Sequence, residues 1–371
     1  MLAASDLLKQ ASAFSQTFSQ RVDVWSKGQL ILENAPVVSG SISANRASSP
    51  RLNCKLVLAT EPWKPLPLNN RTCTVRVYRG VESLGRREVL QQGVFRIDDI
   101  ERGSDGTISL DCSGLEQYII DARLTMPRTP PYLASTVHTI RDLITEIRPF
   151  TVRLESTMNR GITATTPWDK DRWDAVDDLA ASIEAEVFAD ARGEFAIRDI
   201  PHTDGQPVLW VTQGVGGVLV DETVKETREQ VYNAAVVYNQ NTVPGDHPLW
   251  AMSYVSDPND DLYFYGDFGQ VPRFAESQYF TASWQCDRYA RRLIIDAVAR
   301  NTSITFTTAP TVWWLEVGDL VGVDMLDGTQ EVHLLQTMDA DLGPGGIIKF
   351  DTLSTKRAAR MEDDVPDVSV S

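Results

Sequence analysis

The first 125 residues constrain the fold most strongly, because short alternating segments follow one another there with turn signals between them. Residues 52–58, for example, alternate apolar side chains with Asn53 and Lys55, which is the period of a strand that buries one face. A series of six to eight such strands within about 100 residues indicates a small closed or sandwiched antiparallel sheet. The predicted strands cover residues 21–25, 29–33, 36–44, 52–58, 73–78, 87–99 and 107–113.

A different pattern follows from residue 126. The segment MPRTPPY at 126–132 has three prolines in seven residues, which predicts a stiff extended linker. Residues 136–147 place apolar side chains at helical spacing, and residues 150–154 predict a strand. These elements begin an α+β insert.

Residues 168–201 complete the insert with a helix and a hairpin. Trp173 and Val176 begin an apolar stripe at helical spacing, and Asp169 and Asp171 precede it, where carboxylates suit the free N–H groups of a helix start. Gly193 then lies in a short turn between strands predicted at 187–189 and 195–197. The module has no nucleophile, no metal-ligand spacing and no phosphate loop, so we expect it to have a structural role and no catalytic one.

Strand patterns return from residue 207, with turn signals between them and one long helix predicted at 275–299. We therefore expect an α+β, β-rich chain in which two small antiparallel β-barrel domains flank the α+β insert. The expected units are an N-terminal helix at 1–20, a first barrel at 21–125, the insert at 126–206, a second barrel at 207–355 and a flexible tail at 356–371.

The charge of the chain limits its partners. A formal net charge of −16 argues against a nucleic-acid binder, which needs a basic face. Solubility is one explanation of this charge. Another is an acidic surface that repels DNA, so that DNA passes it without binding.

Metal and membrane functions also lack a signal. The four cysteines and four histidines have no metal-ligand spacing, and residues 257–261 lack the regular ligands of a calcium loop, so we expect no metal and no cofactor. No apolar run approaches 18 residues, which predicts no membrane span, and the N-terminus has no secretory pattern.

Four groups of residues, in this order and spacing, resemble the baseplate hub (tail hub) proteins of tailed bacteriophages and related contractile injection systems, including minor tail proteins of phages of actinobacteria. Together they extend over roughly residues 20–355. The groups are residues 21–24 with 38–42 and 52–58; residues 173–180 leading to 185–190 and 193–195; residues 228–237; and the 275–299 helix followed by 310–321.

The resemblance implies a structural protein without enzymatic activity, located in the virion at the tail tip or baseplate and assembled in the host cytoplasm. Three chains would each contribute two barrels to a pseudo-sixfold ring around a channel. That ring would join a hexameric tail tube or distal tail protein to a threefold spike or tip, and DNA would pass through it without specific binding.

Two other functions stay open. A cell-wall glycoside hydrolase would need a working pair of carboxylates, and no stretch singles one out. A receptor- or glycan-binding module would use exposed aromatic side chains. We predict no catalytic residues, and we predict interface positions at Trp313, Trp314, Tyr263, Phe264, Tyr265, Phe14 and Phe18.

Overall fold

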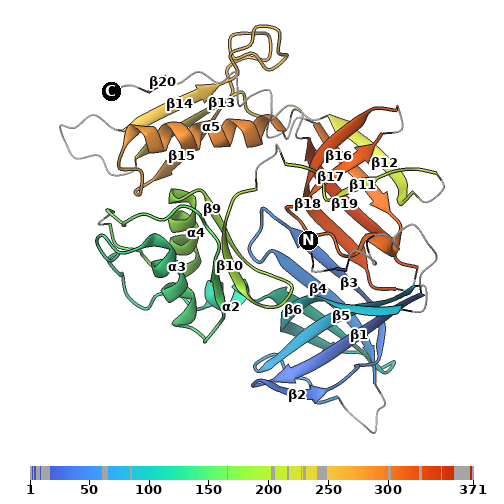
Figure 1. The fold of residues 1–371 in the computed structure, drawn as a ribbon. Helices are drawn as coiled ribbons and strands as arrows, with labels where there is room; N and C mark the ends of the chain where they lie inside the picture. The colour runs from blue at the N-terminus through green and yellow to red at the C-terminus, as the bar shows by residue number, and fades with distance from the viewer. Residues whose placement is uncertain are drawn as a thin grey trace.

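The computed structural model describes residues 2, 4, 5, 9, 17–60, 66–83, 86–164, 166–201, 205–214, 217–226, 228, 231–239, 249–299, 302–325, 328–343, 345–354 and 368–369. Strands dominate this part of the chain, with a few helices beside them (Figure 1). The predicted α+β, β-rich class is confirmed. No helix in the described residues is long and apolar enough to cross a membrane.

The N-terminal β half contains seven antiparallel strands in the order β3-β4-β7-β6-β5-β1-β2. The alternation in the sequence explains them: β4 buries Cys54, Leu56 and Leu58 on one face and exposes Lys55 on the other. The strands are β1 (Thr17–Ser26), β2 (Gln29–Leu32), β3 (Val37–Asn45), β4 (Leu52–Ala59), β5 (Cys73–Ser83), β6 (Arg86–Arg102) and β7 (Thr107–Gly114).

The C-terminal β half is built from segments on both sides of a further unit. It contains β11 (Leu209–Val211), β12 (Leu219–Glu226), β16 (Thr302–Thr308), the 3-10 helix η1 (Pro310–Val312), β17 (Leu320–Asp324), β18 (Gln330–Asp341) and β19 (Ile348–Ser354). Its strands pair in the order β12-β16-β19-β18, and β17 joins β18 to β11.

The two β halves are joined into one 13-stranded sheet by antiparallel pairing of β18 with β3. The register extends from Thr337 opposite Asn45 to Asp341 opposite Ser41. One hydrophobic core runs through both halves. Among the described residues the path of paired strands is open, with β12 at one end and β2 at the other, so two closed barrels are not seen.

A buried arginine strengthens this junction. Arg79 on β5 donates from Nη1 to the carbonyl oxygen of Asp341 at 3.0 Å, and its guanidinium lies 5.1 Å from the ring centre of Phe18. Burial lowers the pKa of Arg79, and the nearby carboxylate of Asp341 opposes that effect. The contact links the first β half to the end of β18.

The insert forms a compact layer with its own core. Its elements are α2 (Glu116–Asp121), α3 (Thr136–Thr145), β8 (Val152–Leu154), α4 (Arg172–Ser182), β9 (Ala185–Ala189) and β10 (Phe195–Asp199). The predicted apolar stripe is buried, and Gly193 takes φ +80° in the hairpin turn. Asp171 is the N-cap of α4 but makes no side-chain capping hydrogen bond; it lies 3.3 Å from Arg123 Nε instead.

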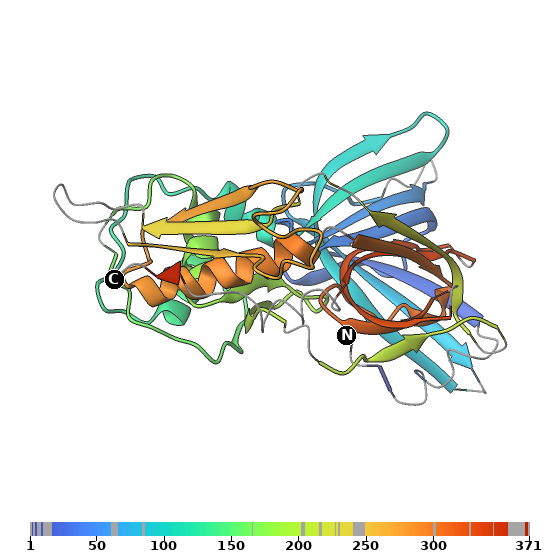
Figure 2. The same ribbon diagram turned by 90° about the horizontal axis from the view of Figure 1, so that it is seen from above.

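The long helix does not join the second β half. Residues 231–239, 249–299 and 368–369 form a separate α/β unit with its own core, in which α5 (Ser283–Ala299) packs on a mixed sheet (Figure 2). The predicted start at residue 275 is wrong, because residues 272–277 pair in parallel with β13. The strands of this unit are β13 (Ala234–Asn239), β14 (Trp250–Tyr254), β15 (Pro272–Ser277) and β20 (Val368–Ser369).

The structure tests the predicted N-terminal helix and C-terminal tail only in part. Residue 9 is helical, most of residues 1–16 lie outside the described residues, and residues 17–20 belong to β1 and not to a helix. Thr17 to Gln20 pair with β5, which accounts for the difference. The predicted tail also lies outside the described residues, apart from β20.

Candidate functional site

The two adjacent tryptophans lie in the core of the chain and not at an interface. Trp313 is 2% exposed and Trp314 is 0% exposed, and both belong to the core shared by the two β halves. The prediction assumed an alternating strand, but residues 310–312 form a 3-10 helix, which leads both rings inward. These two positions are therefore corrected: neither side chain is available to a partner.

The other predicted aromatics have mixed positions. Phe264 is buried, whereas Tyr265 is 62% exposed and lies 5.9 Å from the ring of Tyr254. Tyr263 is half-buried, with its ring 5.8 Å from that of Tyr265. Phe18 is half-buried beneath Arg79, and Phe14 lies outside the described residues. An interface role for Tyr263 and Tyr265 stays a prediction.

The solvent face of the continuous sheet carries a polar row across the junction of the halves. Strand register places Asp341 beside Ser41, Ser41 beside Lys55, Lys55 beside Asp111 and Asp111 beside Asp99. All five of these side chains are exposed, and their neighbours along each strand point to the opposite face. We call this surface the junction face.

The junction face is acidic and hollowed. A shallow groove of about 690 Å³ lies over it and includes Asp111, Asp339 and Asp341 together with Lys55 and Lys349. Lys55 approaches Asp111 at 3.6 Å, and both are well exposed, so this pair contributes little to stability.

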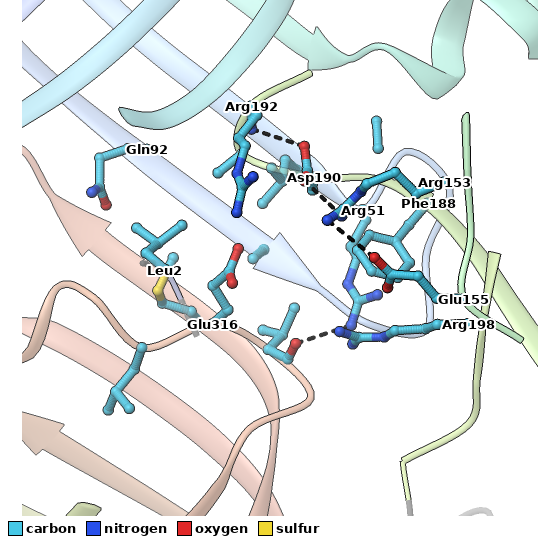
Figure 3. Close-up of a pocket in the computed structure, with 17 residues that line it drawn as sticks. Leu2, Arg51, Gln92, Arg153, Glu155, Phe188, Asp190, Arg192, Arg198 and Glu316 are labelled. Carbon is cyan, nitrogen blue, oxygen red and sulfur yellow. Dashed lines mark hydrogen bonds and ion pairs between the residues drawn. The ribbon is translucent and has the colours of Figure 1, made fainter. Parts of the chain in front are cut away.

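A second pocket, of about 190 Å³, lies where both β halves meet the insert (Figure 3). Leu52 and Gln92 come from the first half, Phe188 and Asp190 from the insert, and Glu316 from the second half. Its volume is below the 300 Å³ or so of ordinary ligand sites, so it suits a few water molecules or one small group.

One carboxylate beside this pocket forms ion pairs with three arginines. Glu186 on β9 lies 3.1 Å from Arg46, 3.4 Å from Arg51 and 2.8 Å from Arg198. Burial raises the pKa of Glu186, but the three guanidinium groups outweigh burial and hold its pKa below the usual range. The ring of Phe188 lies 4.0 Å from the guanidinium of Arg51 and 4.5 Å from that of Arg198.

Arg51 ties together all three parts of the chain. It comes from the loop after β3, pairs with Glu186 of the insert, and donates from Nη2 to the carbonyl oxygen of Val317 at 3.0 Å. Its backbone N–H donates to Glu116, whose carboxylate also accepts from the N–H of Ala189 at 3.0 Å. Burial lowers the pKa of Arg51 and raises that of Glu116.

This network positions domains and lacks reactive groups. Arg153, on the other side of the pocket, is held by Asp190 at 2.8 Å and Glu155 at 3.1 Å. Among the residues that the structure describes, no group of three His, Cys, Asp or Glu side chains is placed to hold a metal ion. Sequence reasoning missed Glu186 and its arginines, because Arg46 and Arg51 lie 140 and 135 residues away and no local pattern marks the contact.

The fold is therefore a continuous β-rich sheet with two attached α/β units. No family model matches the chain, and no curated protein matches its sequence. Solved structures do match. A tail protein from Neisseria meningitidis MC58 has a TM-score of 0.64 at 14% identity, with 92% of this chain and 99% of that chain covered.

Two further matches extend the comparison. The 43 kDa tail protein of prophage MuSo2 from Shewanella oneidensis has a TM-score of 0.62 at 12% identity, covering 91% of this chain and 99% of that chain. A chain of the lidded Francisella PdpA–VgrG complex has a TM-score of 0.54 at 10% identity, covering 96% of this chain and 55% of that chain. The predicted resemblance to tail proteins is confirmed at the level of the fold.

Proposed function

We propose that this protein is a structural hub subunit of a phage tail or a related contractile injection system, and not an enzyme. The observation that carries the proposal is the pairing of β18 with β3, which makes two β halves of one chain into a continuous wall. Its fold is shared with two tail proteins over 99% of their chains, which supports the same role.

Three copies would complete a ring. Each chain would supply two β halves, and a head-to-tail contact between copies generates a closed ring when the rotation is 120°. Strands β12 and β2 end the sheet path and offer edges for that contact. Six units would match a hexameric tail tube or distal tail protein on one side, and the threefold symmetry would match a central spike or tip on the other.

The junction face would line the channel. Its aspartates outnumber its lysines, so the wall would repel the phosphate backbone and let DNA pass without binding. Such a subunit would be assembled in the host cytoplasm and be found in the virion at the tail tip.

Copy number tests the ring. Mass photometry of the purified protein, alone and with its tube partner, should detect a species of three times the 41.3 kDa chain mass. Quantitative mass spectrometry of purified particles should give three copies and not six. A monomer in the presence of the tube partner, or six copies per particle, contradicts the proposal.

Charge reversal tests the channel wall. Replacing Asp111, Asp339 and Asp341 together by Lys should create DNA binding in an electrophoretic shift assay and slow DNA release from particles. The control changes Asp257, Asp261 and Asp267 to Lys, which adds the same charge away from the junction face. Equal DNA binding and equal release by the two variants would show that the junction face has no special relation to the channel.

A further inference from the structure

Helix α5 covers one face of the sheet in its unit, and no other described helix or strand packs on the opposite face. Ala235, Val237 and Ala251 point towards α5 and are fully buried with it in one core. Because side chains alternate along strands, the intervening residues point to the opposite face. We call that opposite side the outer face.

Large apolar and aromatic side chains occupy the outer face in register. Phe274 on β15, Val236 on β13 and Met252 on β14 form one row across the sheet, and Tyr238 and Trp250 are paired in the next. Phe274 is 63% exposed. The apolar and aromatic part of the face consists of Val236, Tyr238, Trp250, Met252, Tyr254 and Phe274, extended by Tyr265 over Tyr254.

Phe274 and Tyr265 are well exposed on this face, and the other five side chains are half-buried. In the part of the chain that the structure describes, none of these seven side chains packs into any of the three hydrophobic cores. Single exposed apolar residues are ordinary, but a contiguous aromatic patch marks a contact surface. The edge of β14 is paired with β20, and β15 forms the opposite edge of the sheet.

The composition fits a protein partner. Trp, Tyr, Phe and Met are the residues enriched in the centres of protein interfaces, where a few of them carry most of the binding energy. The sheet presents them on a flat surface formed by three strands, which suits a broad macromolecular contact. A small molecule would need a concave site to lose most of its exposed area.

The surroundings of the face are acidic. Asp257, Asp261 and Asp267 lie in the loop that carries Tyr265, and the exposed Glu276 of β15 lies on the outer face itself, opposite Tyr238 in the register. Arg273 adds one nearby positive charge. In a twofold contact between two copies through this face, the acidic surroundings would meet themselves, which costs free energy. A basic surface on a different protein would be attracted instead.

We propose that the outer face docks a different protein whose contact surface is apolar at its centre and basic around it. The inference is independent of the proposed ring, because the outer face belongs to the α5 unit and shares no residue with the junction face. Phe274, the most exposed of these side chains, is expected to be a main contact, with Trp250 and Tyr265 contributing from the side of β14.

The test pans a displayed library of random 12-residue peptides against the purified full-length protein. We expect enriched peptides that combine aromatic or aliphatic residues with Lys and Arg. Their affinity should fall at least tenfold for Phe274→Ser, since loss of a main aromatic contact costs above 1.4 kcal/mol. The double variant Asp261→Lys/Asp267→Lys should weaken them as well and reduce the salt dependence.

The control is Tyr132→Ser, because Tyr132 is 67% exposed on the insert and lies off the outer face. Melting temperatures confirm that each variant folds. Selected peptides that lack basic residues, or that bind Phe274→Ser as tightly as the unmodified protein, overturn the proposal. Self-association by sedimentation that is lost in Phe274→Ser also overturns it, in favour of a second copy, as does glycan-array binding lost in the same variant. The mass of the assembly, measured on the same samples, reports separately on the ring.

Discussion

Replacing Glu186 by Gln should loosen the insert from both β halves. The change removes one negative charge and leaves the guanidinium groups of Arg46, Arg51 and Arg198 close together without a counterion. Glutamine keeps an acceptor oxygen and nearly the same shape, so the effect reports on charge and not on packing.

The magnitude follows from burial. The Glu186 side chain is only 16% exposed, and the Arg51 side chain is 5% exposed. Removing one partner from a buried ion pair costs about 3–5 kcal/mol. Because Gln still accepts one hydrogen bond, we expect the lower end, about 3 kcal/mol, which corresponds to roughly a 100-fold change in an opening equilibrium.

Hydrogen–deuterium exchange with mass spectrometry measures this opening locally, which suits a chain of several units better than a global unfolding curve. Amides of β9 and β10 should exchange about 100-fold faster in Glu186→Gln at neutral pH. The matched control is Glu155→Gln, because Glu155 pairs with Arg153 at 3.1 Å but is 43% exposed. Its exposed pair should be worth 1 kcal/mol or less, roughly fivefold.

The pH dependence gives a second check. The pKa of Glu186 is lowered in the folded protein, so its stabilisation is present above the ordinary Glu pKa of about 4.3 and is lost as the pH falls through the folded value. The difference between the variant and the unmodified protein should therefore shrink in acid. Equal exchange in the Glu186 and Glu155 variants at neutral pH would refute the reasoning.

Two further predictions concern single units. Trp173→Ala should destabilise the insert core by about 3–5 kcal/mol, because the side chain is buried; local exchange should rise in α4 while the β halves stay protected, and protection unchanged in α4 would contradict this. Burial lowers the pKa of His333 to about 4, because the folded protein disfavours the charged imidazole. The neutral ring therefore adds its full contribution to the free energy of unfolding above about pH 6.5, and up to about 3 kcal/mol of that free energy is lost as the pH falls towards 4. Thermal melts of His333→Gln should lack that part of the acid dependence.

Local patterns predicted the local elements well. The helix and hairpin around Gly193 follow from helical spacing, alternation and one residue with positive φ, all of which lie within about ten residues of each other. The buried and exposed sides of β4 also follow from alternation alone. Such features need no knowledge of what the strand packs against.

Long-range contacts were beyond these patterns. Residues 272–277 are a strand because β13 pairs with them, although they continue smoothly into helical spacing in the sequence. The inward rings of Trp313 and Trp314 depend on a 3-10 turn that alternation does not indicate. Glu186 of the insert forms ion pairs with Arg46 and Arg51 of the first β half. In the sequence, each of these charged residues looks like an ordinary exposed surface residue.

The pairing of β18 with β3 has a consequence for synthesis. Ser41 pairs with Asp341, which is 300 residues later in the chain. Strand β3 therefore leaves the ribosome long before β18 has been synthesised. At translation rates of 5–20 residues per second, that edge stays unpaired for about 15–60 s. An unpaired edge invites wrong pairing with neighbouring chains. The serines at positions 39, 41 and 43 make the waiting edge polar, which should keep nascent chains apart until the C-terminal β half arrives.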